Sequence, residues 1–224
     1  MIPELQLYQV CLDISPTEFD RLWQLLSEDE RSRCDRFKFA HLRRNFVAAR
    51  ANLRLILSQV LHCKAADIEF EYSDRGKPYL RNQPTDQHIH FNLAHSQNIV
   101  IYAVCRDRQV GIDLEYINLN VNVESIANRY FSETEQKIIQ CLSITPQEQY
   151  LAFYRAWVLK EAYGKATGQG IVNILHLDFA KLLETSNGEV LEVNGWILQL
   201  ISNEIDIPSE YVAALCVSCE LRHS

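Results

Sequence analysis

The two halves of the chain repeat one order of secondary-structure signals, and this repeat restricts the possible folds more than any other feature. Each half opens with a β-rich segment, continues through helix-start signals and closes with apolar, β-branched runs. The run IVIYAVC at 99–105 resembles YVAALCV at 211–217 in pattern. Separate groups of strands and helices are typical of α+β proteins. We therefore predict two similar α+β lobes, an N-terminal lobe at 1–106 and a C-terminal lobe at 107–224.

Capping boxes indicate where the helices begin. Ser27 and Thr145 are each followed three residues later by a glutamate, Glu30 and Glu148, which is the pattern of a reciprocal N-cap. We predict helices over 16–26, 28–37, 41–62, 133–142 and 146–167, the last with Gly168 as its C-cap. Alternating or β-branched runs predict strands over 5–14, 68–72, 88–93, 99–105, 110–117, 196–201 and 211–219. Turn sequences lie at 73–76 and 187–188.

The charge balance argues against a nucleic-acid-binding protein. The formal net charge is -7, whereas nucleic acid is bound by basic surfaces. One segment is nevertheless basic, because eight arginines and lysines lie between Arg31 and Arg54. This segment is either a solvated helix face or a site for a local anionic ligand.

Targeting and cysteine signals indicate a cytoplasmic protein without a membrane partner. The chain has no signal-peptide pattern at its start and no apolar run near the roughly 20 residues that span a bilayer. Its seven scattered cysteines fit reduced thiols better than a disulfide framework. Cys216 and Cys219 form a single C-x-x-C pair, which favours packed thiols over a zinc site that would need further ligands.

Two acidic residues share one face of the strand predicted at 110–117. Asp113 and Glu115 alternate with Ile112 and Leu114, which places the two carboxyl groups about 7 Å apart along the strand. Carboxylates at this distance repel each other unless they are exposed or hold a cation. The pair is therefore either part of a solvent-facing strand or half of a metal site.

A stripe on the helix at 146–167 offers a third carboxylate. Trp157, Glu161 and Lys165 are spaced so that they lie on one helix face. Glu161 and Lys165 can be a plain surface ion pair, but they share their face with an indole that we expect to be largely buried, which favours a cleft. Asp113, Glu115 and Glu161 together would give three oxygen ligands, a set suited to a magnesium ion that also holds a pyrophosphate.

Two further residues lie in turn-like sequences. His95 follows a predicted strand at a polar turn, where it either donates to a phosphate or is satisfied within the turn. Lys77 lies in a Gly-Lys-Pro tripeptide, a pattern that is weak evidence by itself.

Taken in order, these segments resemble the surfactin-synthetase-type (Sfp-like) 4'-phosphopantetheinyl transferases. The resemblance rests on GKP at 76–78, FNLAHS at 91–96, GIDLE at 111–115 and WVLKEAYGK at 157–165, and it extends to RCDRF at 33–37. It implies an enzyme that transfers the 4'-phosphopantetheine group from coenzyme A to a serine of an acyl carrier protein or peptidyl carrier domain and releases 3',5'-ADP. It also implies a monomer with one site, whose two lobes are related by pseudo-twofold symmetry and each contain a small antiparallel sheet packed with helices.

The resemblance further implies roles for individual residues. The N-terminal lobe would bind coenzyme A, and the C-terminal lobe would bind the metal and the carrier protein. The proton of the carrier serine would pass to Glu161 or to a water on the metal. The expected site comprises Asp113, Glu115 and Glu161 as magnesium ligands, Lys165 and His95 at the coenzyme A phosphates, Lys77 near the nucleotide, and Arg33 with Arg43 or Arg44 at the 3'-phosphate; Glu161, Lys165 and Asp113 would be catalytic.

Two positions depart from the family pattern. Ala94 replaces a serine and removes one hydroxyl contact to coenzyme A, and Glu30 occupies the place of a phosphate-binding lysine whose task we expect arginines of the next helix to take over. Two other functions are consistent with the residues alone: a non-catalytic module that binds coenzyme A or a carrier, and a magnesium-dependent phosphohydrolase. The segment from Val121 to Phe131 is interpreted either as an apolar docking patch for the carrier, with Arg129 at its rim, or as core.

Overall fold

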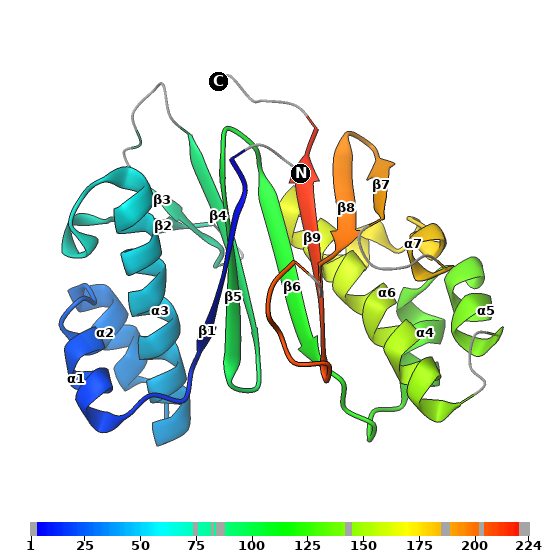
Figure 1. Ribbon diagram of the computed structural model, residues 1–224, viewed down its shortest axis with the longest axis horizontal. Helices are drawn as coiled ribbons and strands as arrows, with labels where there is room; N and C mark the ends of the chain where they lie inside the picture. The colour runs from blue at the N-terminus through cyan, green and yellow to red at the C-terminus, as the bar shows by residue number, and fades with distance from the viewer. Residues whose placement is uncertain are drawn as a thin grey trace. The chain divides into compact units, whose positions relative to one another are not determined.

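The computed structural model describes residues 4–73, 76–81, 83, 88–141, 145–184, 189–201 and 204–219. The chain is an α+β protein with small antiparallel sheets and packed helices, as the sequence predicted (Figure 1). Its strands are β1 Gln6–Cys11, β2 Phe70–Tyr72, β3 Pro78–Leu80, β4 Ile89–Ser96, β5 Ile99–Arg106, β6 Val110–Tyr116, β7 Val190–Val193, β8 Trp196–Leu200 and β9 Tyr211–Ser218. Its helices are α1 Pro16–Trp23, α2 Glu28–Asp35, α3 Ala40–Leu61, α4 Val123–Tyr130, α5 Glu133–Cys141, α6 Pro146–Thr167 and α7 Ala180–Glu184, with 3-10 turns at Ala65–Asp67 and Ile171–Ile174.

The helix starts follow the capping signals of the sequence. The Ser27–Glu30 and Thr145–Glu148 pairs both form complete capping boxes at the starts of α2 and α6. At the other end of α6, Gly168 adopts a left-handed conformation with φ of 73°, which glycine reaches at low cost. The five predicted helices are therefore confirmed.

The strands of the described residues form three sheets of different size. One has the order β1-β5-β4, a second pairs β2 with β3, and a third has the order β6-β9-β8-β7. In the third sheet β9 pairs antiparallel with β6 along its whole length, so that Asp113 lies opposite Ala214 and Glu115 opposite Val212. The last strand of the described chain is therefore an inner strand, with β6 on one side and β8 on the other.

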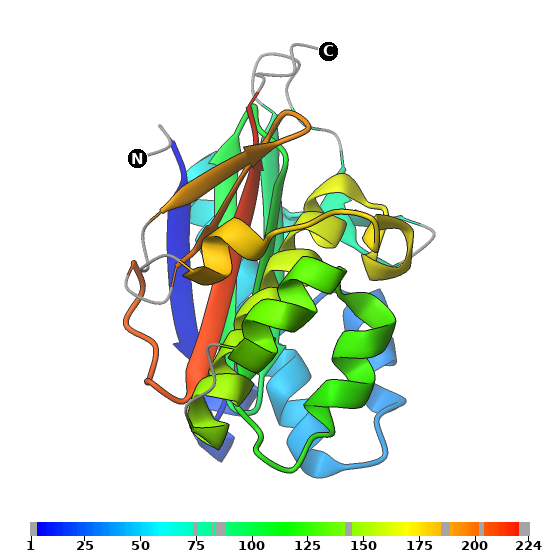
Figure 2. The same ribbon diagram turned by 90° about the vertical axis from the view of Figure 1, so that its right-hand side faces the viewer.

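Contacts divide the chain into two compact units, which we describe separately. The first lies within residues 1–9, 85–96 and 101–224. Its central element is α6, which packs against β6 and β9 and has α4, α5 and α7 gathered around it (Figures 1 and 2). Most residues of α6 from Ala152 to Ala166 are buried, and the exceptions include Trp157, Glu161 and Lys165. The predicted stripe of Trp157, Glu161 and Lys165 thus lies on the partly exposed face of a helix that is otherwise largely buried.

The second unit lies within residues 10–84 and 97–100. Helix α3 packs against α1, α2 and the 3-10 turn at Ala65–Asp67. Leu22, Cys34, Val47 and Leu57 are fully buried within it. The lobe boundary between residues 106 and 107 stays a prediction.

Several elements were not predicted from the sequence. Helix α4, capped by Asn122, and the short elements β3, β7 and α7 carry weak periodic signals. His95 was expected in a turn after the strand, but β4 continues through Ser96. The predicted turn at 187–188 lies outside the described residues.

Of the two interpretations of the segment from Val121 to Phe131, docking patch or core, the structure favours the core for Val123 and Phe131. Val123 and Phe131 are each only 6% exposed and belong to the core around α6. Val121 and Ile126 are partly buried and pack against the same core. These side chains stabilise α4 on the core, so they cannot offer an open patch to a partner.

Two remaining expectations concern thiols and membranes. All seven cysteines are free, and Cys216 is buried within β9, consistent with a packed thiol. Among the described residues, no helix combines the length and the apolar character that crossing a bilayer demands.

Candidate active site

The predicted carboxylates meet where β6 lies against α6. β6 carries Asp113 and Glu115, whereas α6 carries Glu161 and Lys165. The approach of the two elements is close because Gly111 has no side chain: a Cβ there would lie 2.2 Å from the carbonyl oxygen of Ala162. The glycine of the GIDLE segment therefore allows the strand and the helix to present their charged groups to each other.

Asp113 forms the centre of this group. Its side chain is 6% exposed, and its Oδ1 accepts a hydrogen bond from Lys165 Nζ at 2.6 Å. Its Oδ2 is buried and has no hydrogen-bond partner. Burial raises the pKa of Asp113, and the Lys165 ammonium opposes that rise. An unpartnered buried carboxylate oxygen is costly, which suits an oxygen that receives a cation.

The other two carboxyl groups are coupled to Asp113 through their charges. Burial raises the pKa of Glu115, and the negative charge of Asp113 raises it further. The same two causes, in the same order, raise the pKa of Glu161, and Lys165 lowers it in part. All three acids are thus held where an added positive charge would be favourable.

Polar side chains from β4 and α6 orient β6 and its acids. Asn92 Oδ1 accepts a hydrogen bond from the backbone N–H of Ile112 at 2.9 Å. Ser96 Oγ donates to Glu115 Oε2 at 3.2 Å and accepts from the N–H of Tyr116 at 3.0 Å. Trp157 also donates a hydrogen bond to Glu115, and its indole packs against the core around α6.

His95 lies beside the same charges. Although its side chain is exposed, loss of hydration to nearby protein atoms lowers its pKa, and the Lys165 ammonium lowers it further. A neutral imidazole keeps one N–H donor and one acceptor, which is a suitable state for a hydrogen bond to a phosphate oxygen. His95, Asp113, Glu115, Glu161 and Lys165 are therefore brought together within the first unit.

The residues predicted to contact the 3'-phosphate and the nucleotide belong to the second unit. Arg33 is exposed, and its guanidinium lies over the rings of Phe46 at 5.9 Å and Tyr72 at 5.8 Å. Arg43 pairs with Asp35 at 2.6 Å, and Arg44 is exposed. Lys77 is partly buried in the turn between β2 and β3.

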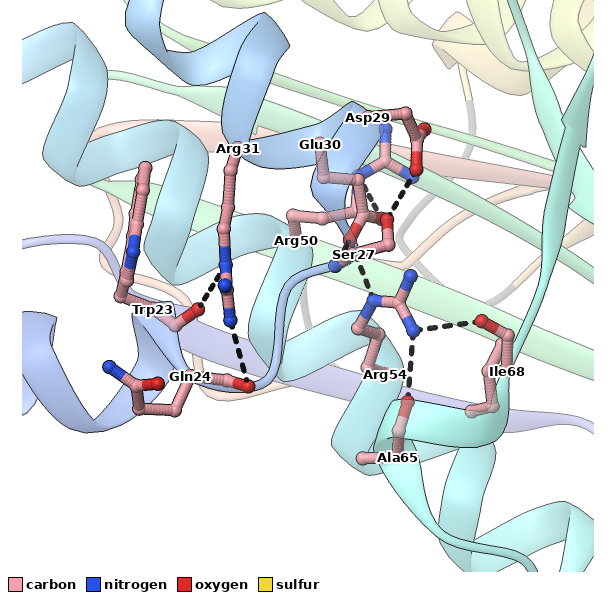
Figure 3. A network of polar contacts seen from close by, with 10 residues as sticks. All are labelled: Trp23, Gln24, Ser27, Asp29, Glu30, Arg31, Arg50, Arg54, Ala65 and Ile68. Atoms are coloured by element: carbon pink, nitrogen blue, oxygen red, sulfur yellow. Dashed lines mark hydrogen bonds and ion pairs between the residues drawn. The ribbon is translucent and has the colours of Figure 1, made fainter.

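Glu30 is paired with two arginines of α3, Arg50 and Arg54, which are therefore not free to take over a phosphate contact. Glu30 is 1% exposed, its Oε2 accepts from Arg54 Nε at 2.7 Å, and its Oε1 lies 3.5 Å from Arg50 Nε (Figure 3). Arg54 also donates to the carbonyl oxygens of Ala65 at 2.9 Å and Ile68 at 2.8 Å. Arg54 is therefore a buried structural cation, so it cannot take over a phosphate from position 30.

The assignment of Asp113, Glu115 and Glu161 as metal ligands stays a prediction. Among residues 4–73, 76–81, 83, 88–141, 145–184, 189–201 and 204–219, no three or more His, Cys, Asp or Glu side chains form a group able to hold a metal ion. Asp113 is bonded to Lys165 instead. The orphaned Oδ2 and the chemistry of the three carboxyl groups nevertheless fit a magnesium ion, provided that Lys165 yields or shares Asp113.

Comparison with known proteins decides the family. Residues 109–216 match the family described as "4'-phosphopantetheinyl transferase superfamily", and residues 13–107 match "4'-phosphopantetheinyl transferase, N-terminal". The 4'-phosphopantetheinyl transferase HetI of Nostoc sp. is 36% identical over 211 residues, which cover 94% of this chain and 88% of that protein. The chain belongs to the 4'-phosphopantetheinyl transferase superfamily.

Other relatives agree with this assignment. A 4'-phosphopantetheinyl transferase of Bacillus subtilis is 28% identical over 96% of this chain and 92% of its own length. The 4'-phosphopantetheinyl transferase Sfp of Bacillus subtilis is 29% identical over 75% of this chain and 72% of its own. The expected Sfp-like family is thus confirmed, and the enzyme transfers the 4'-phosphopantetheinyl group from coenzyme A to carrier proteins. Membership of this transferase family replaces the two alternative functions, a non-catalytic binding module and a phosphohydrolase.

Proposed function

We propose that this phosphopantetheinyl transferase is magnesium-dependent and that Asp113, Glu115 and Glu161 hold the ion. The proposal rests on the Oδ2 atom of Asp113, which is buried and has no hydrogen-bond partner. The charge of Asp113 also raises the pKa values of Glu115 and Glu161. A bound magnesium ion would neutralise charge on the pyrophosphate of coenzyme A and on the departing 3',5'-ADP.

The protein groups around the acids have complementary tasks in this proposal. Lys165 supplies a fixed cation at the pyrophosphate, where negative charge accumulates during transfer. The neutral His95 donates a hydrogen bond to a phosphate oxygen. Arg33, with Arg43 or Arg44, meets the 3'-phosphate, and Lys77 lies near the nucleotide. Asp35 already neutralises part of the charge of Arg43, which favours Arg44 for this contact.

The transfer step requires a base for the carrier serine. The serine Oγ forms a bond to the phosphorus that carries pantetheine, the bond from this phosphorus to the bridging oxygen breaks, and the electron pair leaves with 3',5'-ADP. We assign the serine proton to Glu161. Burial and the charge of Asp113 both raise its pKa, and a base works best when its pKa approaches the working pH.

The experiment is mass spectrometry of apo carrier proteins incubated with enzyme, coenzyme A and graded magnesium. We expect each modified carrier to gain one phosphopantetheinyl group, and we expect chelation by EDTA to stop the reaction. Full transfer in EDTA would refute the magnesium proposal while leaving the family assignment intact.

Glu161→Gln separates the two tasks of Glu161 in the same assay. The amide keeps an oxygen ligand and the side-chain shape but removes the basic site. We expect turnover to fall by roughly 100-fold or more with a smaller change in coenzyme A affinity. Full rescue by high magnesium would show that Glu161 only binds the metal, and it would refute its assignment as the base.

A further inference from the structure

Lys160 lies in the motif that carries Trp157, Glu161 and Lys165, but it has no place in the chemistry described above. Its side chain is 0% exposed, so it cannot touch a substrate. Its Nζ donates to the carbonyl oxygen of Leu177 at 2.7 Å and lies 3.0 Å from Glu135 Oε2. The ammonium also lies 5.1 Å from the ring centre of Phe179. Lys160 is therefore a fully buried lysine whose ammonium group already has two polar partners, and its place in the motif needs an explanation other than substrate binding.

Its partner Glu135 joins three segments of the first unit. The carboxylate is 0% exposed and accepts from the backbone N–H of Ser132 at 2.8 Å and of Phe179 at 2.9 Å. Ser132 caps α5, and Phe179 directly precedes α7. The Lys160–Glu135 pair thus ties α6 to the start of α5 and to the segment that leads into α7.

A buried ion pair is a poor way to gain stability. Removing two charges from water costs about as much as their attraction returns, and apolar residues of similar volume often stabilise a core better. What such a pair supplies is geometric selectivity, because its hydrogen bonds are satisfied in one arrangement only. We propose that Lys160 is a positioning residue, which holds α6 in the rotation about its axis that directs Glu161 and Lys165 toward Asp113 and Glu115.

The opposite side of α6 explains why this rotation matters. Neighbouring residues on a helix differ by about 100° in direction, so fixing Lys160 on the side of α5 and α7 fixes the direction of Glu161. On the other side, the backbone of β6 at Gly111 lies almost against Ala162 and Ala166. At Gly111 this contact is backbone on backbone, and on this side α6 is also joined to β6 by the bonds of Lys165 to Asp113 and of Trp157 to Glu115. The ion pair of Lys160 with Glu135 fixes the rotation of the helix from the far side.

The test is a comparison of Lys160→Met with Leu183→Ala in the presence of coenzyme A. Leu183 is a buried residue of α7, 3% exposed, so its truncation loosens the same core without touching the ion pair. Magnesium binding is measured by calorimetry, and turnover by carrier mass, at a temperature where both variants are folded. We expect Lys160→Met to weaken magnesium binding and to lower turnover, each by about 10-fold or more. Leu183→Ala should lower the melting temperature but leave both quantities near wild type.

Lys160→Gln extends the test, because its shorter amide can still donate a hydrogen bond but carries no charge. It should shift magnesium binding in the same direction as Lys160→Met and by a smaller factor. Magnesium binding equal to wild type in folded Lys160→Met would overturn the inference. Failure of both Lys160→Met and Lys160→Gln to fold would also overturn it, because the Lys160–Glu135 ion pair would then serve global stability alone.

This inference rests on the proposed magnesium site, and the two can fail separately. A wild-type enzyme that transfers the group but binds no magnesium in the calorimeter would refute the site. A wild-type enzyme that binds magnesium, together with an unaffected Lys160→Met, would refute only the role of Lys160.

Discussion

Substituting Gly111 by alanine should damage catalysis far more than stability. A Cβ at this position would lie 2.2 Å from the carbonyl oxygen of Ala162 and 2.4 Å from the amide nitrogen of Ala166. Non-bonded heavy atoms need about 3.5 Å, so the two backbones must separate by roughly 1 Å. β6 cannot yield easily, because the ladder to β9 and the Asn92 hydrogen bond to Ile112 both hold it. We therefore expect α6 to move.

The displacement carries Glu161 and Lys165 away from Asp113. Misplacement of a reacting group by about 1 Å can cost about 100-fold in rate, whereas overpacking a core costs about 1–3 kcal/mol. Turnover at saturating coenzyme A and magnesium measures the first quantity, and thermal melting of the same protein measures the second. A folded Gly111→Ala enzyme with turnover within about threefold of wild type would contradict this reasoning.

Gly164→Ala is the matched control on α6 itself. A Cβ there would lie 3.1 Å from the carbonyl carbon of Gly170, so a shift of a few tenths of an ångström relieves it. Alanine also favours the helix by about 1 kcal/mol over glycine. We expect nearly unchanged turnover. Equal loss of activity in both variants would mean that the close approach at Gly111 is not the cause.

Two further predictions concern buried charges. Arg54→Met should lower the free energy of unfolding by about 3–5 kcal/mol, because it leaves the buried Glu30 poorly paired. Urea unfolding measures this loss. Arg81→Met, which removes an exposed ion pair, is the control, and a similar loss in that variant would contradict the prediction. Asp113→Asn should abolish transfer yet, in EDTA, raise the urea midpoint at pH 7. Burial raises the pKa of Asp113 above its unfolded value of about 4, so the folded protein loses stability as pH rises from there through the raised pKa. The advantage of the variant must therefore shrink toward pH 4, and an advantage that grows on acidification would refute the argument.

The helices and the site stripe were predictable because their signals are local. A capping box needs four consecutive residues, and Thr145 to Glu148 forms one at the start of α6. The stripe of Trp157, Glu161 and Lys165 depends on helical spacing alone, and these residues are among the partly exposed ones on a largely buried helix. The pairing of Lys165 with Asp113 could not be predicted, because it joins a helix to a strand far away in the chain.

Glu30 illustrates the opposite case. Its sequence context correctly indicated the capping box of α2, which also depends on neighbours. Its second role, as the counter-charge of Arg54, depends on how α3 packs and has no local signal. The resemblance to the family showed only that Glu30 replaces a phosphate-binding lysine, and its burial reveals that the carboxylate faces inward.

Orienting residues were missed although their motifs were noticed. Asn92 and Ser96 belong to the FNLAHS segment, and both bond to β6. The role of Val123 and Phe131 stayed open for a related reason: apolar residues at helical spacing fit a docking face and a core face equally well, and packing against α6 decides for the core.

The inner place of β9 in its sheet has a consequence for the order of events during protein synthesis. β6 leaves the ribosome with both acids on it, but the strand that completes its ladder is made only after nearly half of the chain has followed. Until then β6 presents an unpaired apolar edge, which is a hazard for aggregation and a target for chaperones. The nascent chain therefore carries Asp113, Glu115 and Glu161 before the strand that completes the sheet of β6 has been made.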